Sequence, residues 1–93
     1  MKKITWFYLS DCPYCHQARK ALDELKKENP EYKKVEIDWV DEQAHPEIAD
    51  QYDYHAVPCL WIGQQKMYEA HLFETYEECY GKVKAVLEAA VAI

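Results

Sequence analysis

Long apolar segments are missing from this 93-residue sequence. A run such as Ile4–Leu9 ends far short of the roughly 20 apolar residues that a membrane-spanning helix needs. The basic start at Met1–Lys3 resembles a secretory signal, but Asp11 and Cys12 interrupt the apolar run and no small-residue cleavage site follows. We therefore expect no membrane span, no signal peptide and a cytoplasmic protein.

Clustered positive charge is also missing. The sequence has 11 Lys and Arg against 17 Asp and Glu, which gives a net charge of −6. Proteins that bind a phosphate backbone need clustered Lys and Arg, so we expect no nucleic-acid partner. The sequence contains no repeat, no low-complexity tract and no linker, and its length suits one hydrophobic core. We expect one domain over residues 1–93, and a monomer.

The segments that are present alternate between two kinds of pattern. Residues 3–9 are β-branched and aromatic on both faces, which is typical of a buried strand. Pro13 suits the first turn of a helix, and Asn29-Pro30 ends its periodic pattern. Five further elements are predicted: a strand over 35–39, a short helix from Pro46, the two strands of a hairpin over 58–62 and 66–70, and a last helix from Thr75.

The predicted order is β-α-β-α-β-β-α, an α/β fold. A right-handed crossover makes the first two strands parallel, and the hairpin adds antiparallel strands. We therefore expect a mixed four-stranded sheet with helices on both faces. Thr75 and Glu78 form a capping box at the start of the last helix. Its predicted buried positions are Tyr76, Cys79, Tyr80, Val83, Leu87 and Val91.

Two cysteines carry the chemistry. Cys12-Pro13-Tyr14-Cys15 places two thiols one turn apart at a helix N-terminus, directly after a strand. Free N–H groups and the helix dipole there favour a thiolate on Cys12. The spacing lets the second sulfur reach the first, so that a mixed disulfide can be resolved within the molecule. The plainer interpretation is a pair of buried structural cysteines.

The neighbours of the pair have predicted tuning roles. Pro13 stiffens the turn, Asp11 opposes thiolate formation, and Arg19 supports it. Tyr14 is expected to expose its ring and to line a substrate groove. His16 is expected to be exposed and neutral.

Val57-Pro58 is the second element of the candidate site. Proline has no N–H to give to a sheet, so Pro58 fits the start of a strand. Most such peptide bonds are trans, but beside a Cys-x-x-Cys pair in this order of elements we expect a cis bond.

These motifs resemble the thioredoxin superfamily, and Cys12-Pro13-Tyr14-Cys15 is similar to the dithiol glutaredoxins. The resemblance covers essentially the whole chain and implies a thiol–disulfide oxidoreductase that needs no cofactor. It implies that Cys12 is the nucleophile and Cys15 the resolving thiol. Val57 would offer main-chain hydrogen bonds to substrate, with Pro58 beside the sulfurs. The implied substrates are protein disulfides or low-molecular-weight mixed disulfides, with glutathione or a thiol reductase as electron donor.

Three departures from the glutaredoxin pattern concern glutathione. The basic residue expected three before the first cysteine is Leu9, the threonine before Val-Pro is Ala56, and the Gly-Gly and Asp that hold a glutathione carboxylate are replaced by residues 68–71. Glutathione is an anion, and this stretch gains Glu69. Because a charge-assisted contact is worth about 1.5–3 kcal/mol, we expect weak glutathione dependence.

The alternative function is a metal module. Cys12 and Cys15, with His16 and Cys59, offer sulfur and imidazole ligands for Zn²⁺, and a glutaredoxin-type iron–sulfur carrier would use the pair with glutathione. One closely spaced pair without a second is a weak zinc signal, so we assign no metal ligand. Cys59 is expected to be a small buried residue, although a regulatory third thiol remains open, and Cys79 is expected in the core. His45 and His71 carry no signal.

Overall fold

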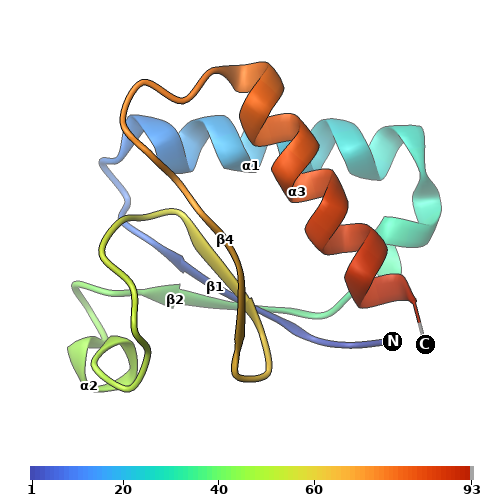
Figure 1. Ribbon diagram of the computed structural model, residues 1–93. Helices are drawn as coiled ribbons and strands as arrows, with labels where there is room; N and C mark the ends of the chain where they lie inside the picture. The colour runs from blue at the N-terminus through green and yellow to red at the C-terminus, as the bar shows by residue number, and fades with distance from the viewer. Residues whose placement is uncertain (93) are drawn as a thin grey trace.

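A computed structural model describes residues 1–92 (Figure 1). The observed order is the predicted one, with a 3₁₀ helix, η1, added between α1 and β2. The elements are β1 (Ile4–Tyr8), α1 (Pro13–Glu28), η1 (Pro30–Lys34), β2 (Ile37–Asp41), α2 (Pro46–Ala49), β3 (Cys59–Ile62), β4 (Gln65–Glu69) and α3 (Tyr76–Val91).

The four strands form one mixed sheet in the order β2-β1-β3-β4. β1 pairs parallel to β2, with Trp6 opposite Trp39, and antiparallel to β3, with Phe7 opposite Cys59. β3 and β4 form the hairpin. Gly63 lies in the turn between them, where its φ is 59°. β1 is therefore central, and its carboxyl end leads directly to the cysteine motif.

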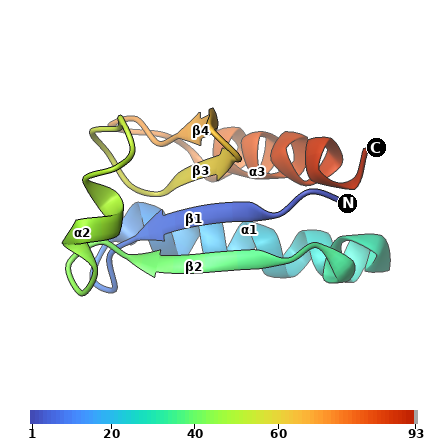
Figure 2. The same cartoon turned by 90° about the horizontal axis from the view of Figure 1, so that it is seen from below.

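Helices cover both faces of the sheet, as predicted. Figure 2 shows α1 and α3 together behind the strands, with α2 on the other side. The larger core lies under α1 and α3 and includes Trp6, Leu22, Leu60 and Leu87. The smaller core, under α2, is built from four buried residues: Phe7, Val40, Cys59 and Trp61. α1 is thus held firmly, which fixes the position of its N-terminus.

Three predicted details of the fold are wrong or incomplete. The second strand begins at Ile37 and not at residue 35, because Asn29 ends α1 and its side chain accepts a hydrogen bond from the Glu31 N–H, which starts η1. The first strand covers residues 4–8, so Leu9 lies outside it. The short helix ends at Ala49, although Tyr52 still packs in the smaller core.

The buried face of α3 also differs from the prediction. Tyr76 and Tyr80 are only half-buried, since their hydroxyls reach the carboxylates of Glu24 and Glu28 on α1, at 2.7 and 2.5 Å. Val91 is half-buried as well, and Val86 and Ala90 are buried instead. The predicted capping box of Thr75 and Glu78 is confirmed.

Within residues 1–92, no helix combines the length and the hydropathy that a membrane span would require.

Candidate redox site

The cysteine motif forms the start of α1. Cys12 is the N-cap residue, and its sulfur accepts a hydrogen bond from the Cys15 N–H at 3.3 Å. Pro13 occupies the first helical position, where a missing N–H costs nothing. The Cys12 sulfur therefore lies at the N-terminal end of the helix dipole, beside the free N–H groups of the first turn.

The two sulfurs lie in different environments. Cys12 is half-buried, whereas Cys15 is only 5% exposed. Burial and then the hydrogen bond with Cys12 raise the pKa of the Cys15 thiol to about 12. Cys12 is therefore the more accessible sulfur, and Cys15 lies behind it as a protonated thiol at neutral pH.

The segment at Val57 and Pro58 lies directly against the motif. The peptide bond between them is cis, as predicted. The Cys12 thiol donates to the Val57 carbonyl oxygen across 3.7 Å, although the two residues are 45 positions apart. Pro58 is buried, and its own carbonyl accepts from the Ala70 N–H at 3.0 Å.

The carboxylate of Glu69 holds the main chain just before Val57 and Pro58. Glu69 Oε2 accepts hydrogen bonds from the main-chain N–H groups of His55 and Ala56, at 2.5 and 2.8 Å. Glu69 Oε1 accepts from Lys66 Nζ at 2.9 Å. Partial burial acts to raise the pKa of Glu69, but these donors outweigh it and hold the pKa below its usual value. Residues 55–57, with Glu69 and Lys66, are called the Glu69 brace below.

A second segment, residues 71–75, contacts the motif from the other side and is called the 71–75 loop. The Phe73 N–H donates to the Tyr14 hydroxyl at 2.7 Å, and Gln17 Nε2 donates to the Glu74 carbonyl at 3.3 Å. Tyr14 is half-buried and packs against the larger core, so its ring is less exposed than predicted. The sequence carries no local signal for the contact between Tyr14 and Phe73.

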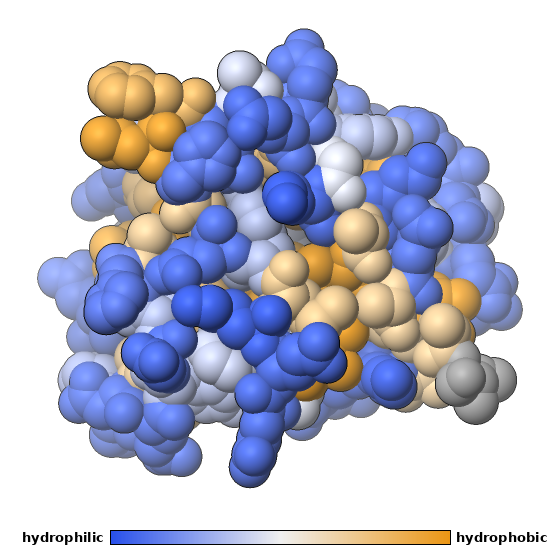
Figure 3. Space-filling model, in the orientation of Figure 1, coloured by the Kyte–Doolittle hydropathy of each residue, from blue (hydrophilic) through white to orange (hydrophobic). Residues whose placement is uncertain are grey.

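The 71–75 loop presents the most exposed large apolar side chains among the described residues. Leu72 is 71% exposed and Phe73 83% exposed. Over this loop, Figure 3 shows a protruding hydrophobic group at the upper left. Phe73 has a φ of 64°, a left-handed conformation that is uncommon for a bulky residue. The apolar side chains thus lie beside the redox motif on an unusual turn.

The remaining predicted tuning residues lie around the motif without touching the Cys12 sulfur. Arg19 places its guanidinium 4.6 Å from the centre of the Trp39 ring and 4.0 Å from Asp23. Asp11 is exposed. His16 is exposed, as predicted, and its Nε2 lies 2.7 Å from the Ser10 carbonyl oxygen. The tuning roles of Arg19 and Asp11 stay predictions.

A cavity of about 240 Å³ opens behind the motif. It is lined by Cys15 and by Trp6, Tyr8, Leu9, Ser10, His16, Arg19 and Trp39. Leu9 and the two indoles make much of this wall apolar, and Arg19 is its one cationic side chain.

The other two cysteines are buried. Cys59 is fully buried, and the Trp61 indole N–H donates to its sulfur at 3.1 Å. Burial raises the pKa of Cys59 to about 12, and burial also raises the pKa of Cys79. Both therefore fit the predicted role of small core residues. Within residues 1–92, three potential metal-ligand atoms converge only at His71, Glu74 and Glu78, a group that includes none of the cysteines.

Solved structures share this fold. A chain described as "Structure of a malarial protein" is 17% identical with a TM-score of 0.56, and the match covers 88% of this chain and 92% of that one. Thioredoxin 1 from the thermophilic eubacterium Thermosipho africanus is 16% identical with a TM-score of 0.58, covering 97% and 99%. Identities this low establish the fold alone. No curated protein matches the chain.

A mixed four-stranded sheet, two thiols at a helix N-terminus and an adjacent cis-proline define the class as thioredoxin-fold thiol proteins. Within this class, the family model for glutaredoxin matches residues 3–67. The chain therefore belongs to the glutaredoxin family, as the sequence motifs indicate, and this membership supports a function of the thiol oxidoreductase type.

Proposed function

We propose that the protein is a thiol–disulfide oxidoreductase in which Cys12 attacks substrate disulfides and Cys15 resolves the product. The observation that carries the proposal is the unequal pair at the start of α1. Cys12 is half-buried and faces the Val57 carbonyl, while Cys15 is buried with a raised pKa. A reducing compartment such as the cytoplasm suits four unpaired cysteines.

The reaction proceeds in two exchanges. The Cys12 thiolate attacks one sulfur of the substrate disulfide, the old S–S bond breaks, and the first substrate thiolate leaves and takes a proton from water. Cys15 then attacks the Cys12 sulfur of this mixed disulfide. The proton of Cys15 ends on the second substrate thiol, and a Cys12–Cys15 disulfide remains. Two electrons have passed to the substrate.

Val57 and Pro58 are the proposed docking residues. An extended substrate can form main-chain hydrogen bonds beside Cys12 at Val57, and Glu69 holds the main chain of the two preceding residues, His55 and Ala56. Tyr14 and the exposed Leu72 and Phe73 extend this surface on the other side of the motif. A protein disulfide with an apolar neighbour fits such a surface.

We further propose that glutathione is a weak electron donor. Leu9 offers no charge to a glutathione carboxylate, and Glu69 places a negative charge near the docking segment. The main-chain N–H groups of His55 and Ala56 are already bonded to that carboxylate. A dithiol reductase is therefore the proposed donor.

The direct test is turnover of a protein disulfide such as insulin. Cys12→Ser is expected to abolish turnover, and Cys15→Ser is expected to stop after one exchange and accumulate a mixed disulfide at Cys12. Cys59→Ser serves as the matched control for loss of a thiol and should keep most of the activity. Full turnover by Cys12→Ser would refute the proposal.

A second test concerns the thiols and the donor. At neutral pH, iodoacetamide should modify Cys12 far faster than Cys15, whose pKa is raised to about 12. The modified site is found by peptide mass spectrometry. Turnover should be slow with glutathione and fast with a dithiol reductase. Rapid glutathione-coupled turnover would contradict weak glutathione dependence and leave the dithiol chemistry standing.

A further inference from the structure

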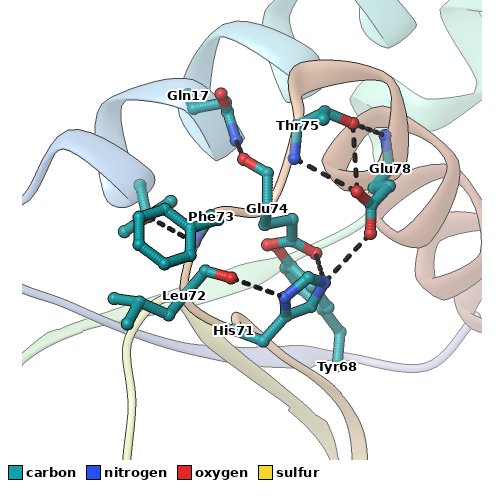
Figure 4. A network of polar contacts seen from close by, with 9 residues as sticks. Gln17, Tyr68, His71, Leu72, Phe73, Glu74, Thr75 and Glu78 are labelled. Carbon is teal, nitrogen blue, oxygen red and sulfur yellow. Dashed lines mark hydrogen bonds and ion pairs between the residues drawn. The ribbon is translucent and has the colours of Figure 1, made fainter.

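Outside the redox site, three side chains converge at the start of α3. His71 Nε2 lies 3.0 Å from Glu78 Oε2 and 3.9 Å from Glu74 Oε2, and one potential ligand atom from each of the three residues lies within 4.8 Å of the other two. Figure 4 shows the His71 ring between the two carboxylates. The redox chemistry uses none of these side chains.

The carboxylate of Glu74 points to a missing ligand. Its side chain is only 1% exposed, yet Oε2 has no hydrogen-bond partner. A buried carboxylate oxygen without a partner is costly, so such atoms are normally paired or coordinate a metal. This oxygen faces His71 Nε2, at the centre of the cluster.

The hydrogen bonding of His71 defines which ring nitrogen is free. His71 Nδ1 lies 3.0 Å from the Leu72 carbonyl oxygen, which can only accept, so Nδ1 carries the proton. In the neutral ring Nε2 then presents a lone pair to two carboxylate oxygens. A second proton on His71 Nε2 would bond Glu78 Oε2 at 3.0 Å but would leave Glu74 Oε2, 3.9 Å away, without a hydrogen bond, whereas one cation can bind all three atoms. A histidine that gives its second N–H to a main-chain carbonyl is the usual arrangement in metal sites.

The two carboxylates are held in a similar way. The Tyr68 hydroxyl donates to Glu74 Oε1 at 2.5 Å, while the Thr75 N–H and hydroxyl lie 3.4 and 3.3 Å from Glu78 Oε1. In each glutamate one oxygen is thus fixed and the other, Oε2, turns toward His71. All three ligand atoms are therefore oriented by outer partners.

From this geometry we propose that His71, Glu74 and Glu78 form a Zn²⁺ site. Tetrahedral zinc binds N and O ligands at about 2.0–2.2 Å, which places neighbouring ligand atoms about 3.3 Å apart. The observed separations of 3.0 and 3.9 Å from His71 Nε2 lie on either side of that value. The imidazole ligand favours zinc over Mg²⁺ or Ca²⁺, which prefer oxygen.

The proposed site is charge-balanced and open to solvent on one side. Two carboxylates and a neutral imidazole carry a charge of −2, which one Zn²⁺ cancels. The side chains of His71 and Glu78 are 58% and 49% exposed, which leaves room for water as the fourth ligand. Bound zinc would fix the 71–75 loop, and with it the contact between Phe73 and Tyr14.

The test is zinc titration by isothermal calorimetry, with Cys12→Ser/Cys15→Ser as the background so that the motif thiols do not bind the metal. We expect one Zn²⁺ per chain. His71→Gln and Glu78→Gln should each weaken binding at least about 100-fold, and Tyr68→Phe, which removes an outer partner, about 10–100-fold. His45→Gln is the matched control, because His45 also lies beside an exposed glutamate, Glu47, at 3.4 Å.

Three results would overturn the proposal. They are no saturable binding at about 1 mM Zn²⁺, binding that survives both His71→Gln and Glu78→Gln, and binding that His45→Gln weakens as much as His71→Gln does. Circular dichroism establishes that each variant is folded, and the exposed Glu78 gives a variant that leaves the core intact. In ¹H–¹⁵N spectra of the same background, zinc should shift the amides of residues 71–78, and Mg²⁺ should not.

Discussion

Two segments approach the cysteine motif from opposite sides, and each is organised by a carboxylate. In the Glu69 brace, both carboxylate oxygens are satisfied, by two main-chain N–H groups and by Lys66. In the 71–75 loop, Glu74 has one oxygen bonded to Tyr68 and the other without a partner. The brace is therefore satisfied within the chain, whereas the loop keeps one buried carboxylate oxygen without a hydrogen bond, where the proposed zinc would bind. The predictions below test how strongly each segment is held and whether the two are independent.

The largest loss of stability is expected from removing the carboxylate of the Glu69 brace. Glu69→Ala removes the acceptor of two main-chain N–H groups and should lower the free energy of unfolding by about 1–3 kcal/mol. Urea denaturation measures this loss. Glu47→Ala, which removes an exposed glutamate, is the control and should change stability by no more than about 0.5 kcal/mol. Equal effects of the two substitutions would mean that the brace does not stabilise the fold.

Acid should weaken the brace in the same way. The folded-state pKa of Glu69 lies below its usual value of 4.5, so its ionised form contributes stability that is present above pH 4.5 and lost as pH falls through the folded pKa. The stability difference between wild type and Glu69→Gln should therefore shrink below pH 4.5, as measured by urea denaturation at several pH values. A stability difference that stays constant with pH would contradict the lowered pKa of Glu69.

Removing the Tyr14 hydroxyl should loosen the 71–75 loop alone. Tyr14→Phe deletes the acceptor of the Phe73 N–H and should cost about 1 kcal/mol. Hydrogen exchange at the Phe73 amide should become faster, while the amides of His55 and Ala56 in the brace keep their rates. Tyr52→Phe, on the opposite face, is the control. Faster exchange in both segments would show that they are not independent.

The smallest effect is expected from relieving the turn at Phe73. This residue is 83% exposed and has a φ of 64°, so Phe73→Asn loses little burial and places a residue that tolerates the left-handed conformation. The free energy of unfolding should rise by about 0.5 kcal/mol. Leu72→Asn, at the neighbouring exposed position, should give no gain. A loss of stability in Phe73→Asn would indicate that its ring contributes contacts in solution.

The features that could be predicted from sequence are those with local causes. Cys12-Pro13-Tyr14-Cys15 follows a strand and starts a helix, and Thr75 with Glu78 marks another helix start. The position of Pro58 in the order of elements predicts its cis peptide bond, which the structure contains. Each of these follows from a few neighbouring residues and from the known order of elements.

The features that could not be predicted depend on contacts across the chain. Tyr14 and Phe73 are 59 positions apart, and nothing in either segment signals their hydrogen bond. His71 gave no signal, because its approach to Glu74 depends on a turn with an unusual residue at its third position. The sequence predicts Glu69 only as a charge opposing glutathione, since its role as an acceptor depends on the positions of residues 55 and 56.

The cavity behind the motif has an optical consequence. Trp6 and Trp39 line the same cavity as Cys15, and the centroids of their rings are 4.7 Å apart. Disulfides quench nearby indole emission, so the intrinsic fluorescence of the protein should fall when Cys15 is oxidised and recover on reduction. Tryptophan fluorescence thus serves as an intrinsic reporter, by which the midpoint potential of the Cys12–Cys15 couple can be measured in a redox titration.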